Sequence, residues 1–209
     1  MMLLYGPHGS GKTLAVHALA KHFGGIVAQI EGLSNLKIQY FVKEFARVAT
    51  EYTMTKRPIF IFIKNIDSLV QNALPELLFL FDKFCNDNRN IELIASSSIP
   101  AQYLPKQMKF TYIQCINCAN QRSKYDLFKF LTAKFGMNIQ MEEQDLMNFV
   151  YHNFRNYSNN DVFQVLKLTL EKKKQSEGNL SEIDRNTLEY ALTNTRGSLS
   201  QQVIQFYNL

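Results

Sequence analysis

The residues most able to do chemistry form a loop near the start of the chain, with the sequence Gly6-Pro7-His8-Gly9-Ser10-Gly11-Lys12-Thr13. The loop fits the pattern G-x-x-x-x-G-K-[ST] without a mismatch, and it has the context which that motif requires, an apolar run before it and a helical pattern after it. Glycines let the backbone amides of such a loop close around phosphate oxygens, and the N-terminus of the next helix adds partial positive charge. We therefore predict a nucleotide-phosphate site made of Gly6, Pro7, His8, Gly9, Ser10, Gly11, Lys12, Thr13 and Leu14.

Within this loop, two side chains have distinct predicted roles. Lys12 is expected to reach the terminal phosphates of ATP or ADP, and the Thr13 hydroxyl is placed to ligate magnesium. The cofactors predicted from the loop are therefore ATP or ADP, with Mg²⁺ as a possible companion at Thr13.

Hydrolysis needs acidic groups that the loop does not contain. Magnesium requires an acidic residue at the end of a neighbouring strand, and the attacking water requires a carboxylate to orient or deprotonate it. The strand expected to supply both, residues 59–63, ends in Lys64-Asn65, and neither side chain is a carboxylate. The sequence therefore predicts a weakened magnesium site and impaired hydrolysis.

Two nearby residues leave alternatives open. Asp67 either replaces the missing carboxylates through a shift of the loop, or caps a helix that starts around Ser68. Lys64 either neutralises phosphate charge where a divalent ion usually sits, or is an ordinary surface lysine. Farther along, Ser98 closes a run of serines after the apolar segment 91–95, where it offers a hydroxyl to the γ-phosphate or simply forms a turn.

Composition argues against DNA binding and against a membrane span. The chain has 209 residues, 46% of them hydrophobic, a net charge of +5 and a pI near 9.0. Its basic residues are scattered except for Lys172-Lys173-Lys174, which we interpret as a solvated helix end, so no DNA partner is expected. No apolar run is long enough for a membrane span, and we expect a cytoplasmic location.

Metal binding by cysteine and histidine is not expected. Cys115-x-x-Cys118 is the only close cysteine pair, and neither a second pair nor a nearby histidine completes a zinc site. His8 and His17 do not have the spacing of a metal-binding pair. The odd number of cysteines suggests a reducing compartment rather than a disulfide framework.

The elements that must position these residues alternate between strands and helices. Apolar runs predict strands at residues 2–5, 26–30, 59–63 and 91–95, and helical spacing predicts helices at 12–22, 38–52 and 74–85. The run 59–63 lacks alternation, as expected for a parallel strand that is buried on both faces. We predict an α/β fold, a P-loop parallel sheet flanked by helices.

The pattern changes at about residue 120. Amphipathic helices are predicted at 122–135, 142–154, 159–174 and 182–193, separated by turn-like residues. The predicted domains are therefore a nucleotide-binding core at 1–119 and a small all-helical lid at 120–209.

These motifs together resemble the AAA+ ATPases, and within them the branch that includes katanin, spastin and fidgetin. The loop 6–13 resembles the Walker A motif, and residues 57–69 resemble Walker B with its two acids replaced by Lys64 and Asn65. Further similar segments are the helix at 76–82, the sensor-1 strand at 93–100, the lid motif at 156–161 and the closing segment at 191–200. Such a resemblance implies oligomerisation and protein partners in a larger assembly.

Departures from the family pattern affect the elements that act on water or substrate. Ser98 stands where the family has asparagine, and Lys109-Phe110 stands where an arginine finger followed by phenylalanine is expected. Between Ile30 and Tyr40 there is no room for the usual aromatic pore loop. The Ile63-Lys64-Asn65 segment also resembles the IQ-and-AAA protein of the ciliary dynein regulatory complex, whose Walker B acids also look replaced, which points to a cytoskeletal or axonemal location.

Three hypotheses follow from this reading. The first is a pseudo-ATPase that binds nucleotide and serves as a structural or regulatory subunit. The second is an active ATPase that remodels protein complexes or microtubules as an oligomer. The third is a DNA-linked P-loop ATPase, which the lack of a basic stripe disfavours.

Overall fold

The computed structural model describes residues 1–30, 57–68, 91–106, 108–175 and 182–207, with the single positions 43, 46, 47, 50 and 79. Apart from those positions, the helices predicted at 38–52 and 74–85 and the stretch between Ile30 and Tyr40 lie outside the described residues. The chain divides into two compact units. We call residues 1–6 and 12–116 the sheet unit, and residues 7–11 and 117–209 the helical unit.

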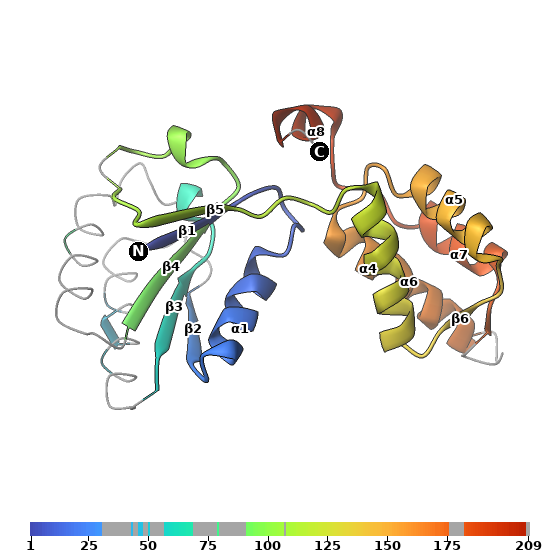
Figure 1. Ribbon diagram of the computed structural model, residues 1–209, viewed down its shortest axis with the longest axis horizontal. Coiled ribbons are helices and arrows are strands. Elements are labelled where there is room, and N and C mark those ends of the chain that lie inside the picture. Colours follow the sequence, from blue (N-terminus) through green and yellow to red (C-terminus); the bar gives the residue numbers. More distant parts are fainter. Residues whose placement is uncertain are drawn as a thin grey trace. The chain divides into compact units, whose positions relative to one another are not determined.

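The sheet unit is built on five parallel strands in the order β2-β3-β4-β1-β5. Their bounds are β1 Met2–Tyr5, β2 Ile26–Ile30, β3 Ile59–Ile63, β4 Ile91–Ser97 and β5 Tyr112–Cys115. Helix α1 (Lys12–His22) follows the phosphate loop and lies along one face of the sheet, as Figure 1 shows. The predicted parallel α/β fold is therefore confirmed.

Alternation along β3 fills both faces of this sheet. Ile59, Ile61 and Ile63 pack into one hydrophobic cluster, and Phe60 and Phe62 pack into the other together with α1. All five residues are buried. Burial on both faces explains why this strand shows no polar alternation in the sequence.

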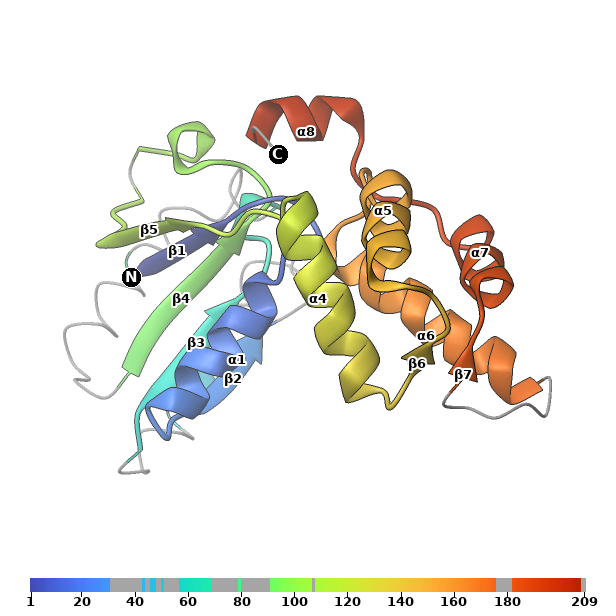
Figure 2. The same ribbon diagram turned by 45° about the vertical axis from the view of Figure 1, so that its right-hand side comes forward.

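The helical unit contains α4 (Gln121–Lys134), α5 (Glu143–Asn153), α6 (Asn159–Gln175), α7 (Arg185–Thr193) and α8 (Gln201–Tyr207). Helix α6 contacts α4 and α7, and α5 contacts α4 (Figure 2). Their apolar faces form one cluster in which Phe128, Phe154, Val162, Val165 and Leu188 are fully buried. The amphipathic spacing in the sequence corresponds to this core.

One predicted helix begins later than expected. Residues 182–183 form a short strand, β7 (Glu182–Ile183), which pairs in parallel with β6 (Asn138–Ile139). The Asp184 side chain then accepts from the Thr187 backbone amide at 2.7 Å and caps α7, which starts at Arg185. The helical unit, predicted to be all-helical, thus carries a small sheet in addition to its helices. Among the described residues, no helix is both long and apolar enough to cross a membrane.

Candidate functional site

Three strand ends meet at the carboxyl edge of the sheet. Because β1 lies beside β4 and β4 beside β3, all in parallel, the residues after these strands come together. The Gly6 amide donates to the Ser97 carbonyl at 3.2 Å, and the Asn65 amide donates to Ser96 Oγ at 3.2 Å. The fold therefore gathers the start of the phosphate loop, the end of β3 and the serine run, as the sequence predicts, and ligands commonly bind at this edge of open α/β sheets.

The phosphate loop depends on glycine at two positions. Gly9 has a φ of 74° and Gly11 a φ of 106°, in the left-handed region that other residues rarely adopt. Between them, the Ser10 amide closes a turn by donating to the Pro7 carbonyl at 3.3 Å. The backbone thus has the sharply turned form that brings amides toward a bound anion.

Lys12 lies across the start of this loop. Its side chain is buried, and Nζ donates to the Gly6 carbonyl oxygen at 2.7 Å. Thr13 is half-buried in the first turn of α1, whereas His8 is exposed and Leu14 is 74% exposed. Of the predicted contacts, Lys12 and Thr13 are therefore placed beside the loop, while the His8 and Leu14 side chains face solvent.

The loop has the properties expected of a site for a phosphate group. Ser10 Oγ is buried and has no hydrogen-bond partner among the residues that the structure describes, although buried hydroxyls are normally satisfied. A Cβ placed on Gly11 would meet no atom within 4 Å, so space remains beside the loop. An unsatisfied hydroxyl, open space and a buried lysine together fit the chemistry of a phosphate, and the group would be held by Ser10, Lys12 and the loop amides.

Gly9 also lies in direct contact with the cap of helix α6. A Cβ on Gly9 would sit 2.2 Å from Ser158 Oγ and 2.8 Å from Ser158 Cβ. Ser158 is itself held by a reciprocal cap: its amide donates to Asp161 Oδ2 at 2.7 Å, and its Oγ accepts from the Asp161 amide at 3.3 Å. Gly9 fills a variable position of the motif, so the sequence alone gave no signal for this contact.

This contact predicts the effect of adding one methyl group. Gly9→Ala should destabilise the protein more than Gly24→Ala, because both positions have positive φ but a Cβ on Gly24 meets no atom within 4 Å. We expect about 1 kcal/mol for Gly24→Ala from backbone strain alone, and at least twice that for Gly9→Ala. Urea denaturation of both variants measures the difference. Equal losses of stability would show that Ser158 does not press against Gly9.

At the end of β3, the backbone turns into a left-handed conformation at Asn65. Asn65 has a φ of 54°, the left-handed conformation that asparagine tolerates better than most residues. Lys64, the residue before it, is half-buried, and its amide continues the pairing with β2 by donating to the Ile30 carbonyl at 3.3 Å. No carboxylate therefore occupies either of the two positions that directly follow β3.

Asp67 and Ser98 bind each other across the same edge. The Ser98 amide donates to Asp67 Oδ1 at 3.3 Å, and the Ser98 hydroxyl donates to Asp67 Oδ2. Asp67 lies within a short 3₁₀ helix, η2 (Ile66–Ser68). A helix that starts after Ser68 would lie outside the described residues, so the expectation that Asp67 caps it stays a prediction. The hydroxyl that Ser98 was expected to offer to a γ-phosphate is already donated to Asp67, because the ends of β3 and β4 lie side by side.

Three further positions considered in the sequence analysis lie outside the phosphate loop. Lys109, at the place of the arginine finger, is exposed in the segment before β5. Cys115 is half-buried and Cys118 is buried, and neither forms a disulfide. Within the described residues, no group of three or more His, Cys, Asp or Glu side chains could hold a metal ion.

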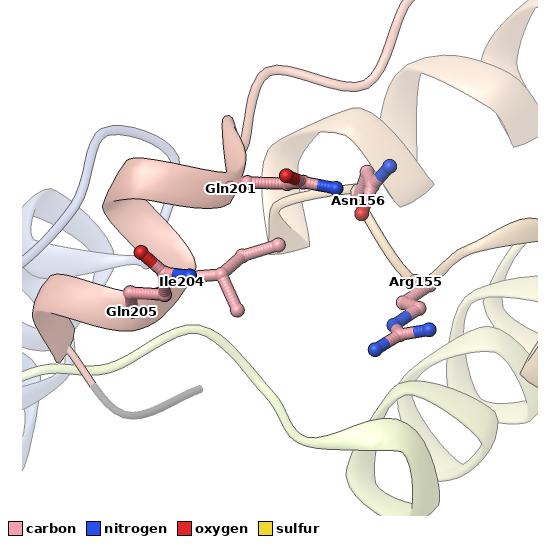
Figure 3. Close-up of a pocket in the computed structure, with 5 residues that line it drawn as sticks. All are labelled: Arg155, Asn156, Gln201, Ile204 and Gln205. Carbon is pink, nitrogen blue, oxygen red and sulfur yellow. The ribbon is translucent and has the colours of Figure 1, made fainter.

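The helical unit has cavities of its own away from the loop. One of about 330 Å³ is lined by Arg155, Asn156, Gln201, Ile204 and Gln205, and Figure 3 shows Gln201 reaching toward Asn156 from α8. A neighbouring cavity of about 430 Å³ includes Lys124. No loop residue lines either space, so neither belongs to the phosphate site described above.

Comparison with known proteins shows which family and which solved structure this chain resembles. Residues 2–117 match the family model described as the ATPase family associated with various cellular activities (AAA). Among solved structures, the FIGL-1 AAA domain in complex with ADP matches with a TM-score of 0.76 and 18% identity, over 99% of this chain and 75% of that one. At this identity the likeness establishes a shared fold.

Curated relatives point to the same family. The proteasome-activating nucleotidase of Saccharolobus islandicus is 32% identical over 163 residues, which is 68% of this chain and 41% of the relative. The nucleotidase of Thermococcus gammatolerans is 29% identical over 65% of this chain and 38% of its own length, and an Arabidopsis thaliana 26S proteasome regulatory subunit 8 homolog is 29% identical over 65% and 37%. The match spans about two-fifths of these relatives. With more than half of its residues matched by the family model, the chain belongs to the AAA ATPase family.

Proposed function

We propose that this AAA module binds ATP or ADP at the phosphate loop, hydrolyses ATP slowly or not at all, and acts as a nucleotide-dependent structural or regulatory subunit. The loop supplies turned glycines, the unsatisfied Ser10 hydroxyl and the buried Lys12 ammonium for phosphate binding. ADP in the structural neighbour supports the choice of an adenine nucleotide. Mg²⁺, when bound with the nucleotide, would be held by Thr13 and would supply charge neutralisation at the phosphates.

The end of β3 carries the proposal of impaired hydrolysis. Its two following residues are Lys64 and Asn65, and the Asn65 backbone adopts a conformation suited to asparagine. Without a carboxylate at either position that directly follows β3, the attacking water lacks the general base expected there, and such a base typically contributes 10²- to 10⁴-fold to a rate.

An active enzyme is the second candidate, and one observation favours it. Asp67 is an acidic side chain at the carboxyl edge of the described sheet, and it lies opposite Ser98. If nucleotide binding breaks the pair with Ser98, this carboxylate becomes available to a water or a metal ion. Asp67→Asn would then abolish turnover, whereas the first candidate predicts no turnover for this variant to remove.

The wider role is proposed from the family. The relatives named above include proteasome-activating nucleotidases and a proteasome regulatory subunit, so we propose that this module works with protein partners in an oligomeric assembly. The replaced acids at Lys64 and Asn65 support a structural place in that assembly, in the cytoplasm or on a cytoskeletal or axonemal structure.

Restoring the two acids tests the proposed defect. The wild-type protein should bind ADP but turn over ATP near background, and Lys64→Asp combined with Asn65→Glu should raise the rate by at least about tenfold if missing carboxylates limit it. Steady-state phosphate release is measured with each variant, across a series of protein concentrations. Rapid, concentration-dependent turnover by the wild type would overturn the proposal and favour the active oligomer.

A further inference from the structure

Asn159 joins two distant parts of the helical unit. It is the first residue of α6, and its Nδ2 donates to the Ser10 carbonyl at 3.0 Å. Its Oδ1 accepts from the Ala119 amide at 2.9 Å. One half-buried side chain therefore uses both ends of its amide, one on the phosphate loop and one on the segment that leads into α4.

The next residue of α6 holds the adjoining loop carbonyl through its backbone. The Asn160 amide donates to the Gly9 carbonyl at 3.1 Å. This amide belongs to the first turn of α6, where backbone N–H groups have no partner within the helix. Two successive loop carbonyls, those of Gly9 and Ser10, are thus turned toward the start of α6.

Peptide planarity gives these bonds a consequence for phosphate binding. In a trans peptide the carbonyl and the N–H of the next residue point in opposite directions, and the described chain has no cis peptide. When Asn159 fixes the Ser10 carbonyl toward α6, it also fixes the Gly11 N–H on the opposite side of the loop. Gly11 has open space beside it, so its amide is held where an anion can reach it.

We propose that Asn159 is a positioning residue for phosphate binding, one that orients the Gly11 amide through the Ser10 carbonyl. This inference rests on the proposed nucleotide function and adds a residue to it that lies 149 positions away from the loop. It also links the loop to α6, because a phosphate that draws on the Gly11 amide strengthens the alignment that Asn159 maintains. Hydrogen bonds in series reinforce one another in this way.

Asn160 provides a matched control in the same helical turn. It is the same residue type, its side chain is exposed, and its bond to Gly9 uses the backbone amide, which survives truncation. Asn159→Ala removes the side chain that holds Ser10, whereas Asn160→Ala removes an equal number of atoms and leaves the loop bonds in place. A general effect on α6 should therefore appear in both variants, and an effect on the loop only in the first.

The experiment measures two properties of the full chain, its affinity for ADP and the behaviour of the Gly11 amide without ligand. Asn159→Ala should weaken ADP binding, measured by calorimetry, by about three- to tenfold, as expected for one net hydrogen bond, and should increase the amplitude of motion of the Gly11 N–H, measured by NMR relaxation without ligand. Asn160→Ala should change both by less than about twofold. If Asn159→Ala does not fold, Asn159→Asp takes its place, because it retains the acceptor for Ala119 and loses the donor to Ser10.

The outcomes separate the two proposals. Equal motion of the Gly11 N–H in the two alanine variants would overturn the positioning role, whatever their affinities. Unchanged ADP affinity in Asn159→Ala alongside greater Gly11 motion would also overturn it, because the amide would then not matter to phosphate. If wild-type protein binds no ADP at all, the proposed nucleotide function fails, and the positioning role that rests on it fails with it.

Discussion

Lys12→Ala is expected to abolish the thermal stabilisation that ADP or ATP gives to this protein. The buried ammonium of Lys12 lies across the start of the phosphate loop. Truncation to alanine removes the positive charge that a terminal phosphate would contact. A ligand at 100 times its Kd stabilises the folded state by about 2.7 kcal/mol. Thermal unfolding with and without nucleotide should show a shift of several degrees for the wild type and none for the variant.

Lys21→Ala is the control for this experiment. Lys21 lies in the last turn of the same helix and is exposed, so its truncation removes one positive charge from α1 without touching the loop. Its nucleotide-dependent shift should equal that of the wild type. A full shift in Lys12→Ala would refute the site, and a lost shift in both variants would reduce it to nonspecific attraction between charges.

Asp161→Ala is expected to cause the largest loss of stability in the helical unit. This carboxylate is only 8% exposed, and Oδ2 accepts from the Ser158 amide at 2.7 Å, from the Ser198 amide at 2.9 Å and from Ser198 Oγ at 2.6 Å. Alanine would leave the buried Ser158 amide and the partly buried Ser198 amide without this partner. We expect the free energy of unfolding to fall by about 3 kcal/mol or more, measured by urea denaturation with circular dichroism.

A neighbouring charge adds to this loss. Burial lowers the pKa of Lys124, and its attraction to Cys118 and Asp161 works in the opposite direction. Removal of Asp161 therefore leaves a buried ammonium with less compensation. Asp126→Ala, at an exposed position of α4, provides the comparison and should change the stability by less than about 0.5 kcal/mol. Similar losses in the two variants would contradict the role of the buried network.

The sequence alone predicted the bounds of elements whose buried apolar residues form a strong pattern. The bounds of α1, β2 and β3 match the prediction because glycines end α1 and because β3 presents five consecutive large apolar residues. Weakly patterned elements were missed. Strand β5 lies at the sheet edge with Tyr112, Ile113 and Gln114 exposed, and α8 buries none of its residues, so neither has the periodicity by which a segment is recognised.

The site was predictable only where its chemistry is local. The phosphate loop could be predicted because eight consecutive residues carry it, and Lys64-Asn65 drew attention because the pair directly follows a strand. The pair of Asp67 and Ser98 joins residues 31 positions apart, and Asn159 meets Ser10 across 149 positions. Such contacts depend on which strand ends and which helix cap come together in three dimensions, and short-range periodicity contains no information on them.

The bond between Lys12 and the Gly6 carbonyl sets up a competition within the loop. The ammonium is solvated by the chain's own backbone, at 2.7 Å, so the cost of burying its charge is partly offset by the protein itself. Because an ammonium has three N–H donors, a phosphate either shares Lys12 with this carbonyl or competes with it for a donor. The loop therefore favours strong acceptors such as phosphate oxygens over weaker ones, which gain less from a cation that already has an internal partner.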